Sequence, residues 1–315
     1  MTTLRVLTPP LIAGGVVPWT LTDAGDQAPG LESADRVRAV QEGLLDGGAA
    51  MVPVRPKSAS AGLAAVLELI REIHDPGLLD ALATTLEPGE ARLFADLAAP
   101  GLSADTPAVS GSWDQALAAA RCAMSAAQLA ADGQGPTYAL VRPPGHHAGP
   151  GFFGGYCYLN NAVVAAIVLQ RSGWDRVAVL DLDHHLGNGT LAHAQRRPEI
   201  GYASIHVSGP GIFPYRFPDA AGLIALECSP SADEYLGHVS SLLTRFENRA
   251  LVVSVGFDGS RGDPHGCWEL PPEVWGGIGV ALGARLHPTV LVQEGGYAID
   301  TNYACARALA EGTRT

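Results

Sequence analysis

The 315-residue sequence lacks most features of secreted, membrane-spanning or nucleic-acid-binding proteins. Its five cysteines are scattered and no two have C-x-x-C spacing, which indicates a reduced, cytoplasmic protein rather than a disulfide scaffold. No apolar stretch reaches the roughly 18 residues of a membrane span, and the N-terminus lacks the basic start and apolar run of a signal peptide. Positive charge is scarce, since 20 Lys and Arg face 32 Asp and Glu, a net charge of −12. This balance argues against a nucleic-acid partner and favours a cationic one.

The composition is that of a globular protein with many tight turns. Hydrophobic residues make up 47% of the chain and charged residues 17%, which excludes a disordered or fibrous protein. Glycine is abundant, at 38 of 315 residues. No internal repeat, charge block or linker divides the chain, so we expect a single domain over residues 1–315.

Short apolar runs alternate with helical patterns along the sequence. The expected strands lie at 4–7, 51–54, 138–141, 176–180, 202–205, 251–255 and 289–292. The expected helices lie at 33–45, 62–74, 113–131, 161–171, 232–246, 272–286 and 303–310. The strands show no alternation of polar and apolar residues, which is typical of parallel strands covered on both faces. The pattern therefore predicts an α/β protein, an open parallel sheet with helices on both faces, with two long loops at 9–31 and 86–105.

Polar and glycine-rich segments follow five of these strands. In chain order they read RPPGHHAGPGFFGGYC, DLDHHLGNGT, HVSGPGIFP, GFDGSRGDP and QEGGY. Ligands of open parallel sheets bind beyond the carboxyl ends of the strands. The sequence thus predicts a functional site at this edge of the sheet.

The segment after 176–180 carries candidate metal ligands. In an extended chain Asp181, Asp183 and His185 share one face, because alternate residues point the same way. A catalytic zinc site needs three protein ligands and one open position, and Asp258 at another strand end can supply the third. The alternative is that the two aspartates cap the following helix. Asp258 at the equivalent position favours the metal site.

The pair His146-His147 lies in a loop of proline and glycine. A general base and an electrostatic partner would each need a carboxylate or amide on the far ring nitrogen, and Asp181 and Asn188 are placed to provide it. The alternative is a pair of exposed or loop-bracing histidines.

Aromatic residues accompany these motifs. Two glycines before Tyr297 allow a sharp turn that aims its phenol into a cleft, where it could stabilise an oxyanion. Tyr156 in the glycine loop, with Phe213 at another strand end, could wall a narrow tunnel. For each of these residues the alternative is ordinary packing in a turn or loop.

Taken together, these segments resemble the zinc-dependent deacetylase superfamily, which has an arginase-like α/β fold. Within it, the chain is most similar to bacterial acetylpolyamine amidohydrolases and histone-deacetylase-like amidohydrolases. The resemblance runs from about residue 33 to 310. It is carried by VRPPGHHAGPGFFGGYCYLNNA, LDLDHHLGNGT, VVSVGFDGSRGDP and VQEGGY.

The resemblance implies a role for each matching residue. The zinc ligands, one ion per chain, would be Asp183, His185 and Asp258. His147 would be the general base, His146 its electrostatic neighbour and Tyr297 the oxyanion donor. The remaining matches are Asp181 and Asn188 as partners of the two histidines, Gly155, Tyr156, Phe213 and Asp105 along the substrate tunnel, and a structural potassium ion near Asp181, Asp183, Ser204 and the carbonyl of His185.

Two positions depart from the family pattern. A gap-free alignment puts Leu186 where a second histidine is usual and His184 where an apolar residue is common. The N-terminal H-P-x-H-P-E signature is also absent, with only the segment from Glu32 to Arg36 similar to it.

The sequence therefore predicts a zinc-dependent hydrolase of a linear amide. The expected substrate is a small N-acetylated amine such as an acetylpolyamine or an acetyl-lysine-like group. We expect no nucleic-acid or membrane partner, and the sequence is compatible with a homo-oligomer. Alternatives are a deacylase of a dedicated secondary metabolite or of protein lysine, a binding-only relative without catalysis, and an arginase-like di-manganese hydrolase.

Overall fold

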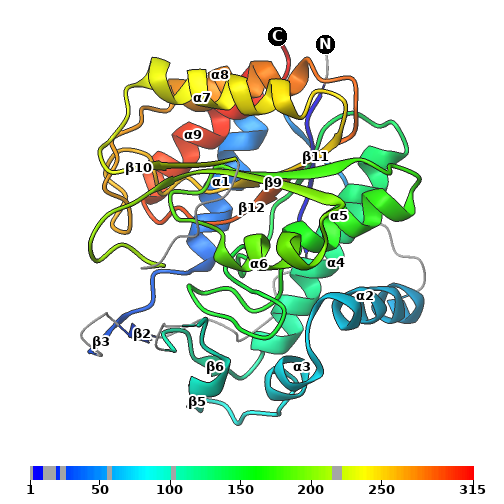
Figure 1. Cartoon of the computed structure of the whole chain (residues 1–315), viewed down its shortest axis with the longest axis vertical. Helices are drawn as coiled ribbons and strands as arrows, with labels where there is room; N and C mark the ends of the chain where they lie inside the picture. Colours follow the sequence, from blue (N-terminus) through cyan, green and yellow to red (C-terminus); the bar gives the residue numbers. More distant parts are fainter. Residues whose placement is uncertain (1–2, 10–18, 22–25, 55–58, 101–103, 215–221) are drawn as a thin grey trace.

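A large parallel sheet forms the centre of the molecule (Figure 1). The computed structural model describes residues 3–9, 19–21, 26–54, 59–100, 104–214 and 222–315. Within these ranges the main sheet has eight strands in the order β10-β9-β8-β11-β12-β7-β1-β4, and all neighbours are parallel. The strands are β1 (Arg5–Leu7), β4 (Ala50–Met51), β7 (Thr137–Ala139), β8 (Val177–Asp181), β9 (Ile200–Val207), β10 (Leu223–Leu226), β11 (Ala250–Val255) and β12 (Thr289–Gln293).

The seven strands expected from the sequence are all in this sheet, and the parallel α/β architecture is confirmed. The expected strand at 51–54 is shorter than predicted, because only Ala50–Met51 pairs with β1 at the sheet edge. The sequence did not predict β10. This strand forms the opposite edge and is only half-buried, so it lacks the continuous apolar run that marks the central strands.

Helices cover both faces of the sheet. They are α1 (Ala34–Asp46), α2 (Ala59–Ile73), α3 (Pro76–Leu82), α4 (Ser112–Ala131), α5 (Asn161–Arg171), α6 (Asn188–Arg196), α7 (Ala232–Arg245), α8 (Glu273–Gly283) and α9 (Ile299–Gly312). Seven of them match the expected helices. The other two, α3 and α6, were not predicted, because α3 has only seven residues and α6 begins inside the glycine-rich segment after β8.

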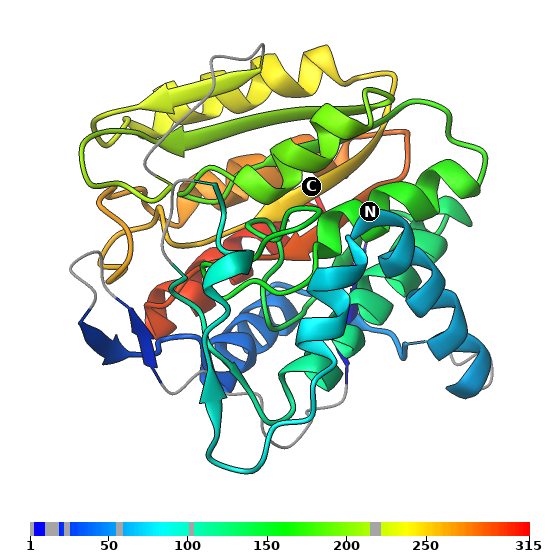
Figure 2. The same cartoon turned by 60° about the horizontal axis from the view of Figure 1, so that its bottom comes forward.

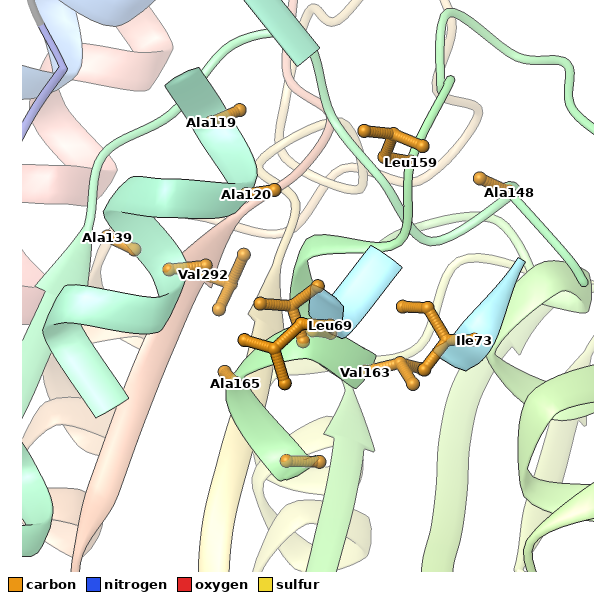
Figure 3. Packing of buried hydrophobic residues seen from close by; sticks show 14 of the residues in the cluster. Leu69, Ile73, Ala119, Ala120, Ala139, Ala148, Leu159, Val163, Ala165 and Val292 are labelled. Atoms are coloured by element: carbon orange, nitrogen blue, oxygen red, sulfur yellow. The ribbon is translucent and has the colours of Figure 1, made fainter. Parts of the chain in front are cut away.

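Two separate apolar cores lie between the sheet and its helix layers. One contains residues of α2, α4 and α5, and the other residues of α1, α7, α8 and α9. Figure 3 shows part of the first core, where Leu69 and Ile73 of α2 meet Val163 of α5. Successive strand residues alternate between the two: Val179 belongs to the first and Leu180 to the second. Both faces are therefore apolar, which is why the strands show no polar alternation.

The order of the strands reverses around β8. The chain passes from β8 to β9 and β10 on one side and then returns to place β11 on the other side of β8, followed by β12 beside β7. Loops that follow neighbouring parallel strands at such a reversal meet beyond their carboxyl ends. Segments far apart in the sequence, after β7, β8, β11 and β12, are thereby brought to one place.

The two long loops expected from the sequence contain short structured pieces. Within 9–31, β2 (Trp19–Leu21) pairs with β3 (Gln27–Pro29); within and just after 86–105, β5 (Ala91–Arg92) pairs with β6 (Ala108–Val109). A short 3₁₀ helix, η1 (Ala95–Leu97), follows β5. Residues 10–18, 22–25 and 101–103 of these loops lie outside the described residues. Among the helices in the described part of the chain, none combines the length and apolar character needed to cross a membrane.

The packing of α1 against α9 yields a stability prediction. A Cβ atom added at buried Gly43 of α1 would lie 2.2 Å from the carbonyl oxygen of Tyr303 in α9, whereas one added at Gly237 of α7 would meet nothing within 4 Å. We expect Gly43→Ala to lower the free energy of unfolding by about 1–3 kcal/mol, because the two backbones must separate. The matched control, Gly237→Ala, should raise it by about 0.5–1 kcal/mol through helix propensity. Urea denaturation measures both, and a Gly43→Ala variant as stable as Gly237→Ala would contradict the close packing.

Candidate active site

The segments after β7, β8, β11 and β12 converge beyond the carboxyl ends of these central strands. In Figure 2 the arrowheads of β9 and β10 point toward the side of the molecule that carries the β2–β3 hairpin. Two contacts connect that rim to the site: the Leu21 amide donates to the carbonyl oxygen of Asp105 (3.1 Å), and the Asp105 carboxylate accepts from the Gly155 amide (2.9 Å).

Asp183, His185 and Asp258 come together at this edge. One ligand atom from each lies within 4.8 Å of the others, and no other such group of three is found in the described ranges. His185 Nδ1 is 3.0 Å from Asp258 Oδ2 and 3.5 Å from Asp183 Oδ1. The structure thus unites the three side chains that the sequence predicted as metal ligands.

Glycines and backbone amides hold the two carboxylates in place. A Cβ atom on Gly295 would lie 2.6 Å from Asp258 Oδ2 and 2.7 Å from Asp183 Oδ2, so only glycine fits here. The Gly295 amide donates to Asp183 Oδ2 (2.8 Å) and the His184 amide to Asp258 Oδ1 (3.1 Å). The carboxylates are therefore fixed before any ligand arrives.

The charges of this cluster match what a divalent cation requires. Burial opposes protonation of His185, but its bonds to Asp183 and Asp258 outweigh that effect and raise its pKa to about 9. The two carboxylates thus favour positive charge on the group between them. Two carboxylate oxygens and one imidazole nitrogen form a donor set that suits zinc, whose binding would require His185 to be neutral.

His146 and His147 lie beside this cluster, each with the partner predicted from the sequence. His146 Nδ1 is 3.3 Å from Asp181 Oδ2, and His147 Nδ1 is 2.8 Å from Asn188 Oδ1 at the start of α6. Burial opposes protonation of His146, yet the charges of Asp183 and Asp181 raise its pKa to about 10. These charges therefore favour the imidazolium form of His146.

His147 is held in the opposite state. Burial, together with the positive charges of His146 and His185, lowers the pKa of His147 well below its usual value. Since the Asn188 oxygen can only accept, Nδ1 of His147 carries the proton and Nε2 keeps a free lone pair. A Cβ atom on Gly155 would lie 2.4 Å from Cδ2 of this ring, and Gly155 has a φ of +55°, so this position requires glycine.

Two buried residues support the histidine loop from outside the predicted site. Glu294 accepts the amides of Gly145 (2.6 Å) and His146 (3.1 Å) and the hydroxyl of Ser254 (3.1 Å). His74 lies 2.9 Å from the carbonyl oxygen of Gly149 through Nδ1. The sequence analysis assigned neither role, although Glu294 lies in the QEGGY segment.

Tyr297 follows a turn whose backbone is bound by side chains of other segments. Gly296 has a φ of +111°, and its carbonyl accepts from Arg36 Nε (2.5 Å). The Arg36 guanidinium carbon lies 4.5 Å from the centre of the Tyr297 ring, a cation–π contact. Burial raises the pKa of the Tyr297 phenol well above its usual value, so the phenol remains a hydrogen-bond donor.

Aromatic rings surround the space beside Tyr297 and His147. The Tyr156 ring lies 5.7 Å from that of Tyr297, and the Phe213 ring meets that of His147 edge-on at 4.8 Å. His265, which the sequence did not single out, bonds Tyr156 Oη through Nε2 (3.2 Å) and meets the Tyr297 ring at 4.6 Å. Tyr156 thus lies beside Tyr297, and Phe213 and Gly155 lie beside His147. That these residues wall a substrate tunnel stays a prediction. The Asp105 carboxylate accepts hydrogen bonds from the Gly155 amide and the Thr106 hydroxyl.

The two departures from the family pattern pack into the protein interior. His184 is buried edge-on against Trp268 (4.6 Å) and accepts the Cys267 amide through Nε2 (3.2 Å). Burial lowers its pKa to about 4, so it is a neutral packing residue. Leu186 is fully buried in the first apolar core. Neither change removes a side chain from the Asp183–His185–Asp258 cluster.

The resemblance also implied a potassium site near Asp181, Asp183, Ser204 and the carbonyl of His185. Asp181 of β8 and Ser204 of β9 are register partners. The Ser204 hydroxyl is 3.0 Å from His206 Nδ1 and the Tyr202 hydroxyl donates to Asp181 (3.0 Å). Potassium binding here stays a prediction.

Comparison with known proteins agrees with this geometry. A sequence profile of the histone deacetylase domain matches residues 30–313. The acetylpolyamine amidohydrolase of Burkholderia pseudomallei (strain 1710b) is 38% identical over 214 residues, 64% of this chain and 62% of that protein. Acetylpolyamine amidohydrolase 1 of Pseudomonas aeruginosa is 34% identical over 222 residues, 66% of this chain and 64% of that protein. The chain thus spans less than two thirds of the length of these two curated relatives.

Two further relatives cover more of the chain. Histone deacetylase 8 of Arabidopsis thaliana is 32% identical over 311 residues, 89% of this chain and 78% of that protein. The crystal structure of an acetylpolyamine aminohydrolase from Burkholderia pseudomallei superposes with a TM-score of 0.82 at 28% identity, covering 99% of this chain and 98% of that one. The expected arginase/deacetylase-like fold is therefore confirmed. Because the profile spans most of the sequence and the fold agrees along nearly its whole length, this chain belongs to the histone deacetylase family.

Proposed function

We propose that the chain is a single catalytic domain that hydrolyses a linear N-acyl amide with the help of zinc, with a small N-acetylated amine as its substrate. The observation that carries this proposal is the meeting of three different groups beyond the carboxyl ends of the central strands. They are the cluster of Asp183, His185 and Asp258, the free lone pair of His147, and Tyr297, whose turn is bound to Asp183 through the Gly295 amide. The names of the relatives, acetylpolyamine amidohydrolases and histone deacetylases, support an acetylated amine as the substrate.

The metal ligands would be Asp183, His185 and Asp258. Zinc in such a site supplies a Lewis acid and makes water more acidic. The alkyl chain of the acetylated amine would lie between Tyr156 and Phe213, with Gly155 leaving room beside His147. Asp105 would support this wall through the Gly155 amide.

The protein's own groups would move the protons. Nε2 of His147 would take a proton from the attacking water, while Asn188 keeps the ring in the required tautomer. Tyr297 would donate its phenolic proton in a hydrogen bond to the substrate oxygen as negative charge develops there. His147 would then pass its proton to the departing amine. His146, whose pKa is raised by the charges of Asp183 and Asp181, would stabilise the negative charge as an imidazolium without changing its own state.

A substrate panel tests the proposal itself. Purified, zinc-loaded protein should release acetate from acetylated polyamines or from other small acetylated amines, because the names of its relatives indicate this substrate class. Acetyl-lysine peptides and longer acyl-lysines complete the panel. Faster turnover of the peptides would assign the protein to lysine deacylation, and absence of hydrolysis of every amide would favour a binding-only relative.

Tyr297→Phe tests the oxyanion donor. Loss of one such donor should lower turnover roughly 10²- to 10³-fold with unchanged zinc content, since the phenol touches none of the ligands. The matched control is Tyr303→Phe, which removes an exposed phenol that bonds Asp46 (2.7 Å) and should leave turnover unaffected. Near-wild-type turnover in Tyr297→Phe would remove this residue from the mechanism.

His147→Ala separates catalysis from binding. The variant should lose hydrolysis because the proton acceptor is gone, yet retain zinc and bind an aliphatic hydroxamate, because His147 lies outside the ligand cluster. Elemental analysis and calorimetry measure the two retained properties. If the variant loses its metal instead, His147 belongs among the ligands and the proposed set is wrong.

A further inference from the structure

Asp263 is a buried carboxylate to which the proposed mechanism gives no role. It lies five residues after Asp258, in the loop that follows β11, and is only 7% exposed. The segment GFDGSRGDP contains it, but the sequence alone indicated nothing for its side chain.

The Asp263 carboxylate joins two loops of the site through three backbone amides. Oδ2 accepts from Tyr297 (2.5 Å) and Ala298 (3.0 Å), and Oδ1 accepts from His265 (2.9 Å). Hydrogen bonds from backbone amides to a charged acceptor are stronger than those to a neutral one. One side chain thus fixes the backbone of both Tyr297 and His265. The rings of these two residues meet at 4.6 Å beside the ligand cluster.

The contacts of Asp263 complete the anchoring of the turn before Tyr297. The Gly295 amide is bound to Asp183 and the Gly296 carbonyl to Arg36. Without Asp263, the amides of Tyr297 and Ala298 would lose their acceptor, while the contacts at Gly295 and Gly296 would remain. The phenol is attached directly to the residue that would be released.

We propose that Asp263 is a positioning residue, which sets the place of the Tyr297 phenol by binding the Tyr297 and Ala298 amides. The inference rests on the proposed function, in which Tyr297 is the oxyanion donor. A misplacement of about 1 Å in such a group can cost as much as 10²-fold in rate.

Asp263→Asn tests the inference, because it removes the negative charge and leaves one acceptor oxygen, so the amides of Tyr297, Ala298 and His265 can no longer all be bound. We expect kcat to fall roughly 10- to 100-fold with little change in KM or zinc content. The decisive comparison repeats the substitution in the Tyr297→Phe background, where it should cost less than about twofold, because the group that it positions is already gone. Glu269→Gln, an exposed carboxylate on the same loop that pairs with Arg261, is the matched control and should leave kcat unchanged.

A general structural role for Asp263 gives a different result. The loss would then be the same factor in both backgrounds, or zinc would be lost, and either outcome overturns the inference. If Asp263→Asn does not fold, Asp263→Glu makes the same comparison, since it keeps the charge but moves the acceptor by one methylene.

A binding measurement keeps this test independent of turnover. The four proteins are the wild type, Asp263→Asn, Tyr297→Phe and the double variant. Asp263→Asn should lower the affinity for an aliphatic hydroxamate only where Tyr297 is present. An inactive wild type that still shows this coupling would refute the proposed hydrolysis and support the positioning role. An active wild type with equal losses in both backgrounds would refute the positioning role alone.

Discussion

The pairing of β8 with β11 is the constraint on which the site depends. Ser254 of β11 lies opposite Asp181 of β8, so the two strands end at nearly the same level. Asp183 and Asp258 follow their strands by a few residues and therefore meet, although 75 positions separate them in the sequence. The reversal of strand order around β8 makes these two strands neighbours, and it is a property of the whole sheet rather than of either loop.

The convergence of these loops buries several carboxylates, and neighbouring cationic side chains compensate their charge. Buried carboxylates are costly unless they are paired and hydrogen-bonded. Asp181 and Asp183 have His146 as a cationic neighbour, and buried Glu32 pairs with Arg36 (3.0 Å) and Arg142 (2.7 Å). The same charges set opposite protonation states on the adjacent histidines, so that His146 stays charged while His147 stays neutral. The charge pairs that make burial of these carboxylates possible thus also set the protonation of the two histidines.

The sequence predicted the parts of this arrangement that depend on local pattern. Apolar runs identified the central strands, and the D-L-D-H-H and EGGY segments identified the residues that now cluster. It did not predict short or edge elements such as α3, α6 and β10, whose signals are brief or interrupted by glycine. It also did not identify Asp263, Glu294 or Arg36, because they act on backbone groups of other loops: Arg36 bonds a carbonyl 260 positions away. It did not identify His265 because the rings that His265 contacts, those of Tyr156 and Tyr297, lie on other loops. Such partners are set by the tertiary fold, and nothing in their neighbouring residues indicates them.

The central claim is that Asp183, His185 and Asp258 together hold one divalent metal ion. Elemental analysis of protein purified and dialysed in parallel measures it, with Asp258→Ala compared against Asp300→Ala, which alters an exposed aspartate in the first turn of α9. The account predicts one zinc ion per chain in the wild type and in Asp300→Ala, and little zinc in Asp258→Ala, because two ligands cannot replace three. A wild type without bound metal after zinc loading, or full zinc content in Asp258→Ala, would contradict it.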